Sequence, residues 1–122
     1  MWTIRETIDV PVKEVRQFAS GGSSFAIYTL RFAPDAREPS VRFVTALERP
    51  EPEADYWIPF IEEGMREYLA DWAREGKPVG HVVVSLVGLR LHPIDSKPNT
   101  FKRTAKLATA QALEKCGVEV DG

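Results

Sequence analysis

Residues 79–102, VGHVVVSLVGLRLHPIDSKPNTFK, carry the strongest structural signal in this chain. Their first half is a long apolar run of the kind that forms a strand buried on both faces or nearly so. A short polar loop with one histidine follows, and the Ser96 hydroxyl can then cap a helix whose first turn tolerates Pro98. Alanines recur from there to Ala112. The segment therefore predicts a buried strand, a polar loop and a helix lying close to a sheet.

The predicted helix begins with a concentration of positive charge. Residues 97–106 include four basic side chains and no acidic one. Cations in the first turns oppose the helix macrodipole, and no Asp or Glu lies three or four residues away inside the segment to offset them. The basic residues are Lys97, Lys102, Arg103 and Lys106. We therefore expect them to face an anion outside the domain.

The rest of the chain reads as strands followed by one helix. The expected strand segments are residues 2–8, 12–18, 25–32 and 41–47. We expect the first two to be joined near Pro11. Apolar residues at three- and four-residue intervals predict a helix over residues 55–75. Asp55 is a plausible cap for it, and Gly76 is expected to end it in a left-handed conformation.

Several short sequence blocks together carry a family resemblance. They are Arg5-Glu6-Thr7-Ile8, Ser20-Gly21-Gly22, Tyr56-x-Ile58-Pro59 with Gly64, Lys77-Pro78-Val79, and His92-x-x-Asp95-Ser96 followed by Phe101-Lys102. In this order and at this spacing they resemble domain IV of bacterial translation elongation factor G, here as a stand-alone domain. The resemblance runs over most of residues 2–113.

The resemblance implies an α+β two-layer sandwich like the second domain of ribosomal protein S5. In that fold the helices lie on one face of a four- or five-stranded sheet, and a βαβ unit has a left-handed crossover, which bacterial ribonuclease P protein shares. We expect residues 1–116 to form this single domain and residues 117–122 to be a loose tail. Helices near 55–75 and 97–115 should lie on the same face of the sheet.

The resemblance also implies a function at the ribosome. In the family the loop that holds His92 lies at the domain tip and contacts the tRNA–mRNA duplex. The first tip loop departs from the family pattern, because it is one residue shorter and lacks an arginine. Loops 20–24 and 90–97 and the basic helix are thus the expected contacts with ribosomal or structured RNA. The candidate residues are Gly21, Gly22, Ser23, Arg90, His92, Lys97, Lys102, Arg103 and Lys106.

Several classes of protein are disfavoured by the sequence. No GxxxxGK[ST] loop is present, so we expect neither nucleotide binding nor a GTPase. One cysteine, Cys116, and two histidines give no metal-ligand spacing, and no cofactor is expected. His92, Asp95 and Ser96 share one loop, unlike a catalytic triad assembled from separate elements. The single cysteine and the absence of a signal peptide or a membrane-spanning run indicate a cytoplasmic protein.

Three functions remain open. The first is a non-enzymatic module that binds the ribosome or RNA. The second is a protein-interaction domain on the same fold that has lost RNA binding and has a protein partner or forms a homodimer. The third, a small-molecule enzyme, ranks last because no acid, base or nucleophile pair converges.

Charge is unevenly distributed along the chain. Residues 33–75 carry five basic and eleven acidic side chains, whereas residues 76–122 carry seven basic and four acidic ones. Such a distribution gives a domain two electrostatic faces, although a solvated acidic helix explains it equally well.

Overall fold

The computed structural model describes residues 1–17, 23–92 and 95–120. Within these ranges the chain forms strands and two helices in the order strand, strand, strand, strand, helix, strand, helix, strand. Their bounds are β1 Trp2–Ile4, β2 Ile8–Gln17, β3 Ser23–Pro34, β4 Val41–Thr45, α1 Ala54–Arg74, β5 Val82–Arg90, α2 Pro98–Cys116 and β6 Gly117–Glu119. Both helices are therefore present close to the bounds expected from the sequence.

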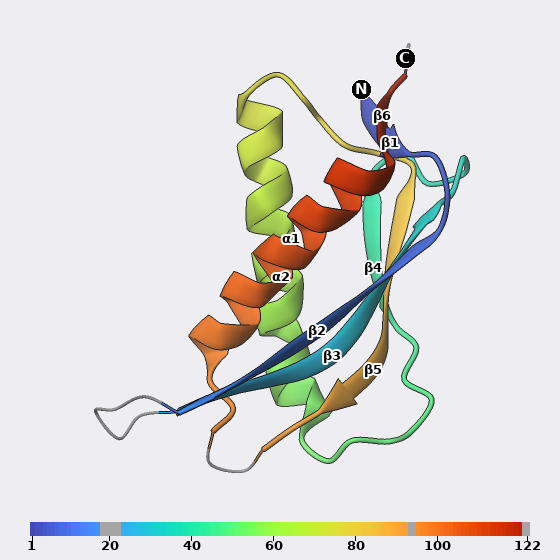
Figure 1. Ribbon diagram of the computed structural model, residues 1–122. Helices are drawn as coiled ribbons and strands as arrows, with labels where there is room; N and C mark the ends of the chain where they lie inside the picture. Colours follow the sequence, from blue (N-terminus) through green and yellow to red (C-terminus); the bar gives the residue numbers. More distant parts are fainter. Residues whose placement is uncertain (18–22, 93–94, 121–122) are drawn as a thin grey trace.

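The main sheet has four strands in the order β2-β3-β5-β4. β3 is antiparallel to β2 and to β5, whereas β4 and β5 are parallel and are connected through α1. Both helices lie on the same face of this sheet, and neither helix covers the opposite face (Figure 1). The predicted two-layer α+β architecture is thus confirmed, and the left-handed sense of the crossover stays a prediction.

Two details of the strands differ from the expectation. The break between the first two strands lies at residues 5–7, and Pro11 is inside β2. β2 is an edge strand that pairs only with β3, so a residue without an N–H is tolerated there. The expected loose tail is wrong for residues 117–119, because β6 pairs antiparallel with β1 from Trp2 to Ile4. The two ends of the described chain are thereby joined.

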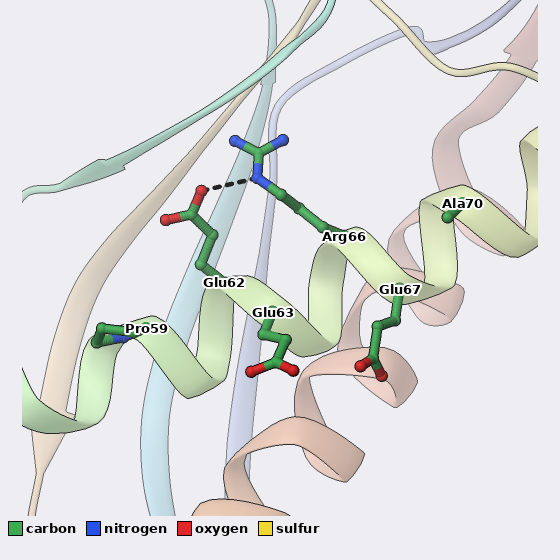
Figure 2. A pocket seen from close by; sticks show the side chains of 6 residues that line it. All are labelled: Pro59, Glu62, Glu63, Arg66, Glu67 and Ala70. Atoms are coloured by element: carbon green, nitrogen blue, oxygen red, sulfur yellow. Dashed lines mark hydrogen bonds and ion pairs between the residues drawn. The ribbon is translucent and has the colours of Figure 1, made fainter.

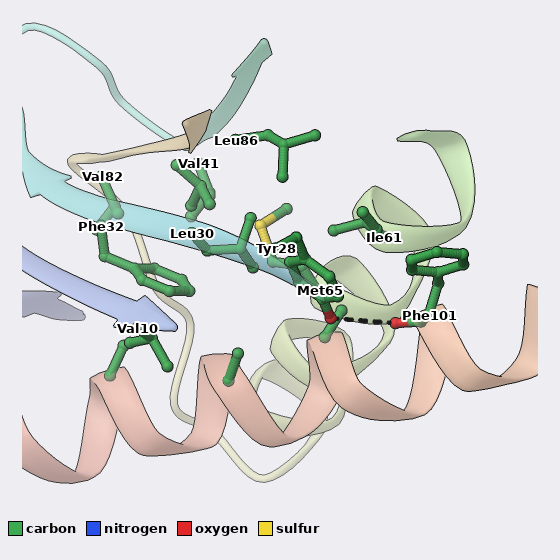
Figure 3. Close-up of a cluster of buried hydrophobic side chains, with 14 of the residues drawn as sticks. Val10, Tyr28, Leu30, Phe32, Val41, Ile61, Met65, Val82, Leu86 and Phe101 are labelled. Atoms are coloured by element: carbon green, nitrogen blue, oxygen red, sulfur yellow. Dashed lines mark hydrogen bonds between the residues drawn. The ribbon is translucent and has the colours of Figure 1, made fainter. Parts of the chain in front are cut away.

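The hydrophobic core lies between the sheet and the two helices. Along β3 every second side chain faces inward and is buried, as the alternating sequence requires. From α1, Ile61 and Met65 are 0% exposed, and Figure 3 shows them close to Leu86 and Tyr28 of the sheet. The α2 face that meets them is buried at Phe101, Ala105, Ala108, Ala112 and Leu113, as predicted. β5 is buried on its inner face and half-buried on the other, because helices cover only one side.

The two helices approach very closely at Gly64. A Cβ atom at this position would overlap the backbone carbonyl of Lys102 in α2. Only glycine therefore allows the two helix backbones to come this near. The crossing at Gly64 and Lys102 sets how the basic side of α2 meets α1.

α1 ends as the sequence predicts but begins differently. Gly76 has a φ of 81°, and the N–H groups of Gly76 and Lys77 donate to the carbonyls of Ala73 and Trp72, which is a Schellman motif. Asp55 is not the cap, because the helix begins at Ala54. Asp55 lies in the first turn, where its negative charge favours the helix dipole.

The helix crossing gives a stability prediction. Gly64→Ala is expected to lower the free energy of unfolding by about 1–3 kcal/mol, because the added methyl group overlaps backbone that cannot rotate away. At an exposed helix position the same change would stabilise by about 1 kcal/mol. Gly88→Ala is the matched control, since a Cβ there meets nothing within 4 Å. Urea unfolding of the three proteins measures the difference, and equal midpoints for the two variants would contradict a tight crossing.

The buried Tyr28 gives a pH prediction. Its side chain is 2% exposed, and its hydroxyl lies 2.6 Å from Thr104 Oγ1. Burial raises the pKa of Tyr28 above its usual value. The folded state therefore holds this proton when the unfolded chain releases it above about pH 10, and stability is lost as pH rises from there.

Thermal melts over the alkaline range test this. Tyr28→Phe should reduce the loss of stability above about pH 10, because the titrating group is gone. Tyr56→Phe is the control, since Tyr56 is 62% exposed, and it should follow the wild-type profile. A profile for Tyr28→Phe that also matches the wild type would show that another group causes the alkaline loss.

Candidate nucleic-acid interface

Two loops that the sequence singled out are joined at one end of the sheet. The Ser23 hydroxyl donates to an Asp95 carboxylate oxygen, and the Lys97 ammonium donates to the Ser23 carbonyl. Phe25 and Ser96 form an isolated parallel bridge. The end of the β2–β3 hairpin and the segment after β5 therefore form one surface, at the lower end of the molecule in Figure 1. We call Ser23, His92, Asp95, Ser96 and Lys97 the tip.

His92 is held at the tip by its neighbours. Its Nδ1 accepts a hydrogen bond from the Asp95 backbone N–H at 3.0 Å, and its ring lies 5.5 Å from the ring of Phe25. The same nitrogen lies 3.5 Å from Asp95 Oδ2, so both the backbone and the side chain of Asp95 face it. The side chain is 41% exposed. His92 thus presents a fixed, partly exposed aromatic ring.

Ser96 does not cap α2, and this expectation is wrong. Its hydroxyl accepts a hydrogen bond from the His92 backbone N–H at 2.9 Å, and its own N–H donates to the His92 carbonyl. The residue preceding α2 is Lys97, which is extended and forms no side-chain cap. Pro98 at the start of the helix needs no acceptor, because it has no N–H. The Ser96 hydroxyl therefore orders the tip loop.

The expectation that the helix cations face an external anion is wrong for three of them. Lys102 Nζ lies 3.0 Å from Glu63 Oε1, Lys106 Nζ lies 2.8 Å from Glu67 Oε2, and Arg103 pairs with Glu14 of β2. Figure 2 shows Glu63 and Glu67 pointing from α1 toward the neighbouring helix. The partners come from other elements, so spacing inside the basic segment could not reveal them.

The cations lower the pKa values of two of their acidic partners. The hydrogen bond from Lys106 lowers the pKa of Glu67, and the hydrogen bond from Arg103 lowers the pKa of Glu14. Glu14 also accepts from the Ser24 hydroxyl, and its side chain is only 10% exposed. One sequence signal could have found the helix pairs, because Glu63 and Glu67 share the four-residue spacing of Lys102 and Lys106.

A hollow of about 530 Å³ along α1 is not an acidic binding site. It is lined by Pro59, Glu62, Glu63, Arg66, Glu67 and Ala70. Glu62 pairs with Arg66 at 2.7 Å, and the other two carboxylates face Lys102 and Lys106. Each carboxylate of this hollow therefore already has a cationic partner, and no charge is left over for a ligand.

The remaining candidate residues lie apart from this paired surface. Ser23, His92 and Lys97 come together at the tip, and Arg90 is exposed at the end of β5. Gly21 and Gly22 lie outside the described residues. Within the described parts of the chain, no three His, Cys, Asp or Glu residues are grouped to hold a metal ion. Neither described helix is long and apolar enough to cross a membrane.

The chain is similar in sequence to bacterial elongation factors. The family model for elongation factor G, domain IV, matches residues 3–117. Elongation factor G 1 and elongation factor G 2 of Syntrophomonas wolfei are 29% and 34% identical to this chain over 114 residues. These alignments cover 91% and 92% of this chain but 16% of each relative.

A structural comparison agrees with the fold. A crystal structure of a Thermus thermophilus protein has a TM-score of 0.76 at 22% identity, covering 96% of this chain and 17% of that chain. The architecture is therefore that of a known α+β domain. Together with the family match, this makes the chain a translation-factor domain. It belongs to the elongation factor G domain IV family.

The network around Glu14 gives a prediction. Glu14→Gln removes the charge that pairs with Arg103 and should lower the free energy of unfolding by about 1–2 kcal/mol at neutral pH. Because the folded pKa of Glu14 is lowered, its contribution is present above the unfolded value of about 4.3 and is lost as pH falls. The variant should therefore lose less stability on acidification than the wild type.

Urea unfolding at neutral and acidic pH measures this. Glu114→Gln makes the same change at an exposed position of α2 and should stay within about 0.5 kcal/mol of the wild type. If Glu14→Gln were no less stable than this control at neutral pH, the Glu14 network would contribute nothing to folding.

Proposed function

We propose that this domain binds structured RNA of the ribosome through its tip and acts without catalysing a reaction. Membership of the elongation factor G domain IV family supports this, since the relatives are translation factors. The observation that carries the proposal is the joining of the two tip loops by Ser23, Asp95 and Lys97 into one polar surface. Because the chain covers 16% of those relatives, the ribosome enters as a proposed partner.

The tip has the chemistry that RNA requires. The Lys97 ammonium has three donors, and its bond to the Ser23 carbonyl holds it beside the hairpin while leaving donors for a phosphate. The exposed part of the His92 ring offers a flat surface for a base or ribose. Asp95 is engaged by the Ser23 hydroxyl, and this bond spreads its charge and weakens its repulsion of phosphate.

The arrangement of the tip also supports a non-enzymatic role. A serine nucleophile needs a base beside its hydroxyl. The Ser96 hydroxyl instead accepts a hydrogen bond from the His92 backbone N–H, and Ser96 is 9% exposed. Neither this hydrogen bond nor this low exposure of Ser96 is suitable for a nucleophile. The domain is proposed to recognise RNA through the placement and charge of its tip side chains.

One observation favours the second function, a protein-interaction domain that has lost RNA binding. Lys102, Arg103 and Lys106 are each paired with a carboxylate of the same chain, so a phosphate would have to compete with that carboxylate for each of them. RNA affinity then rests on fewer cations than the sequence suggested. Salt dependence distinguishes the two functions, because phosphate contacts release counterions and apolar interfaces do not.

Cosedimentation with ribosomes at graded salt tests the proposal. Lys97→Ala should weaken binding and reduce the logarithmic salt slope by about 0.7–0.9, because the variant cannot neutralise the phosphate that Lys97 would bind. Lys106→Ala is the matched control, since it removes the same charge from a residue that pairs with Glu67. His92→Ala should weaken binding with little change in salt slope, because the ring is proposed to contact a base or ribose rather than a phosphate.

Two results would contradict the proposal. If the wild type does not sediment with ribosomes even at low salt, the interaction-domain function takes its place. If Lys97→Ala and Lys106→Ala weaken binding equally, net charge rather than the tip determines binding. Both variants change exposed or half-exposed side chains, and their melting temperatures should confirm that they are folded.

A further inference from the structure

The uncovered face of the main sheet places positive and apolar side chains in rows. The inner face of β3 is formed by Ala26, Tyr28, Leu30 and Phe32, which are buried beneath the helices. The residues between them face outward. The strand register places Lys13 of β2 and Arg90 of β5 directly on either side of Ile27. These three side chains therefore form one row across the outer face.

The two cations of this row are not neutralised by the chain. Lys13 and Arg90 are exposed, and neither is paired with a carboxylate of the described residues. On the same face Arg31 is paired with Asp9 at 2.8 Å, and on the helix side Lys106 is paired as described above. Lys13 and Arg90 stand about two strand spacings apart, roughly 10 Å. They are thus positioned to hold two negative groups of one extended ligand.

Apolar side chains lie beside this row and connect it to the tip. Phe25 and Val15 are partners in the next row, and Val15 is 59% exposed. The Phe25 ring lies 5.5 Å from that of His92, so the apolar surface continues to the tip. A flat apolar surface with cations at its edge favours a ligand that has both planar rings and regularly spaced negative charges.

A hollow of about 360 Å³ borders the row beside Arg90. It is lined by Leu47, Glu48, Arg49, Pro50, Glu51, Val87, Gly88, Leu89 and Arg90. It lies where the β3–β5 ladder shifts register, next to the pairing of Thr29 with Gly88. Such irregularities redirect side chains and are frequent next to binding sites. The lining contains two cations, Arg49 and Arg90, and two carboxylates, Glu48 and Glu51, so the hollow has no formal net charge and contributes its shape rather than positive charge.

We infer that the outer sheet face binds single-stranded RNA that continues from the tip, with phosphates at Lys13 and Arg90 and bases against Phe25, Ile27 and the hollow beside Arg90. RNA suits this face better than an acidic peptide does, because a peptide carboxylate brings no planar ring for the apolar surface. The inference extends the proposed function and rests on it for the choice of RNA. It adds a second surface and the strandedness of the RNA.

Fluorescence anisotropy with a labelled single-stranded oligouridine tests the inference. The double variant Lys13→Ala, Arg90→Ala should bind about tenfold more weakly, with a salt slope reduced by about 0.7 for each phosphate that is no longer neutralised. The double variant Arg37→Ala, Lys115→Ala is the matched control. It removes the same charge at two exposed positions that are also without a carboxylate partner in the described chain. This control should bind like the wild type.

The outcomes separate this inference from the proposed function. Equal loss of oligouridine binding in both double variants would overturn the inference, because binding would then follow net charge. Competition by polyglutamate as effective as by unlabelled oligouridine would overturn it too, since the face would then accept any polyanion. If Lys97→Ala impairs sedimentation with ribosomes while Lys13→Ala, Arg90→Ala leaves oligouridine binding intact, the tip proposal stands and the sheet inference fails. If neither ligand binds the wild type, both fail.

Discussion

The contact of Gly64 with the backbone of Lys102 is the constraint on which the rest of the structure depends. Without a side chain at Gly64, α1 and α2 lie with their backbones in contact. This approach brings Glu63 and Glu67 to Lys102 and Lys106, and α2 is held over the inner face of the sheet. From that position Thr104 reaches the hydroxyl of Tyr28. The absence of a Cβ atom at Gly64 thus determines both how the two helices pack and how α2 covers the core.

The same contact determines where positive charge remains. Carboxylates from α1 and β2 pair with the three helix cations, so the positive charge of these α2 residues is balanced within the domain. The side chains of Lys13 and Arg90 lie on the opposite side of the sheet, beyond the reach of the α1 carboxylates. A chain with a net charge of −2 therefore keeps a local positive face. Charge distribution, rather than total charge, is what an anionic partner meets.

Much of the fold followed from the sequence because it depends on local patterns. The apolar stripe around Ile61 and Met65, the alternation along β3 and the left-handed Gly76 all have signals within a few residues. Ser96 failed as a predicted cap, because the backbone of His92 competes for its hydroxyl and Pro98 reduces the need for a cap. The competing partner lies only four residues away, so the capping rule failed against another local hydrogen bond.

The candidate site was harder to predict, because its key interactions join residues far apart in the sequence. Lys97 was selected for its charge, but its bond to Ser23 spans 74 residues and could only be suggested by the resemblance. Lys13 carried no signal at all, since a single cation in an edge strand is common and also protects the edge from pairing.

The position of these cations bears on the departure of the first tip loop from the family pattern. The resemblance places an arginine in that loop, whereas this chain has Ser23 and Ser24 after its glycines. A cation on a loop reaches its ligand at the cost of ordering the loop. Lys13 and Arg90 extend from strands whose backbones are fixed by the β2–β3 and β3–β5 ladders, so the spacing of their Cα atoms is set before any ligand arrives. Under the inference made above, these cations on the sheet supply part of the charge that the loop lacks, and their row across the strands suits an extended strand better than a duplex groove.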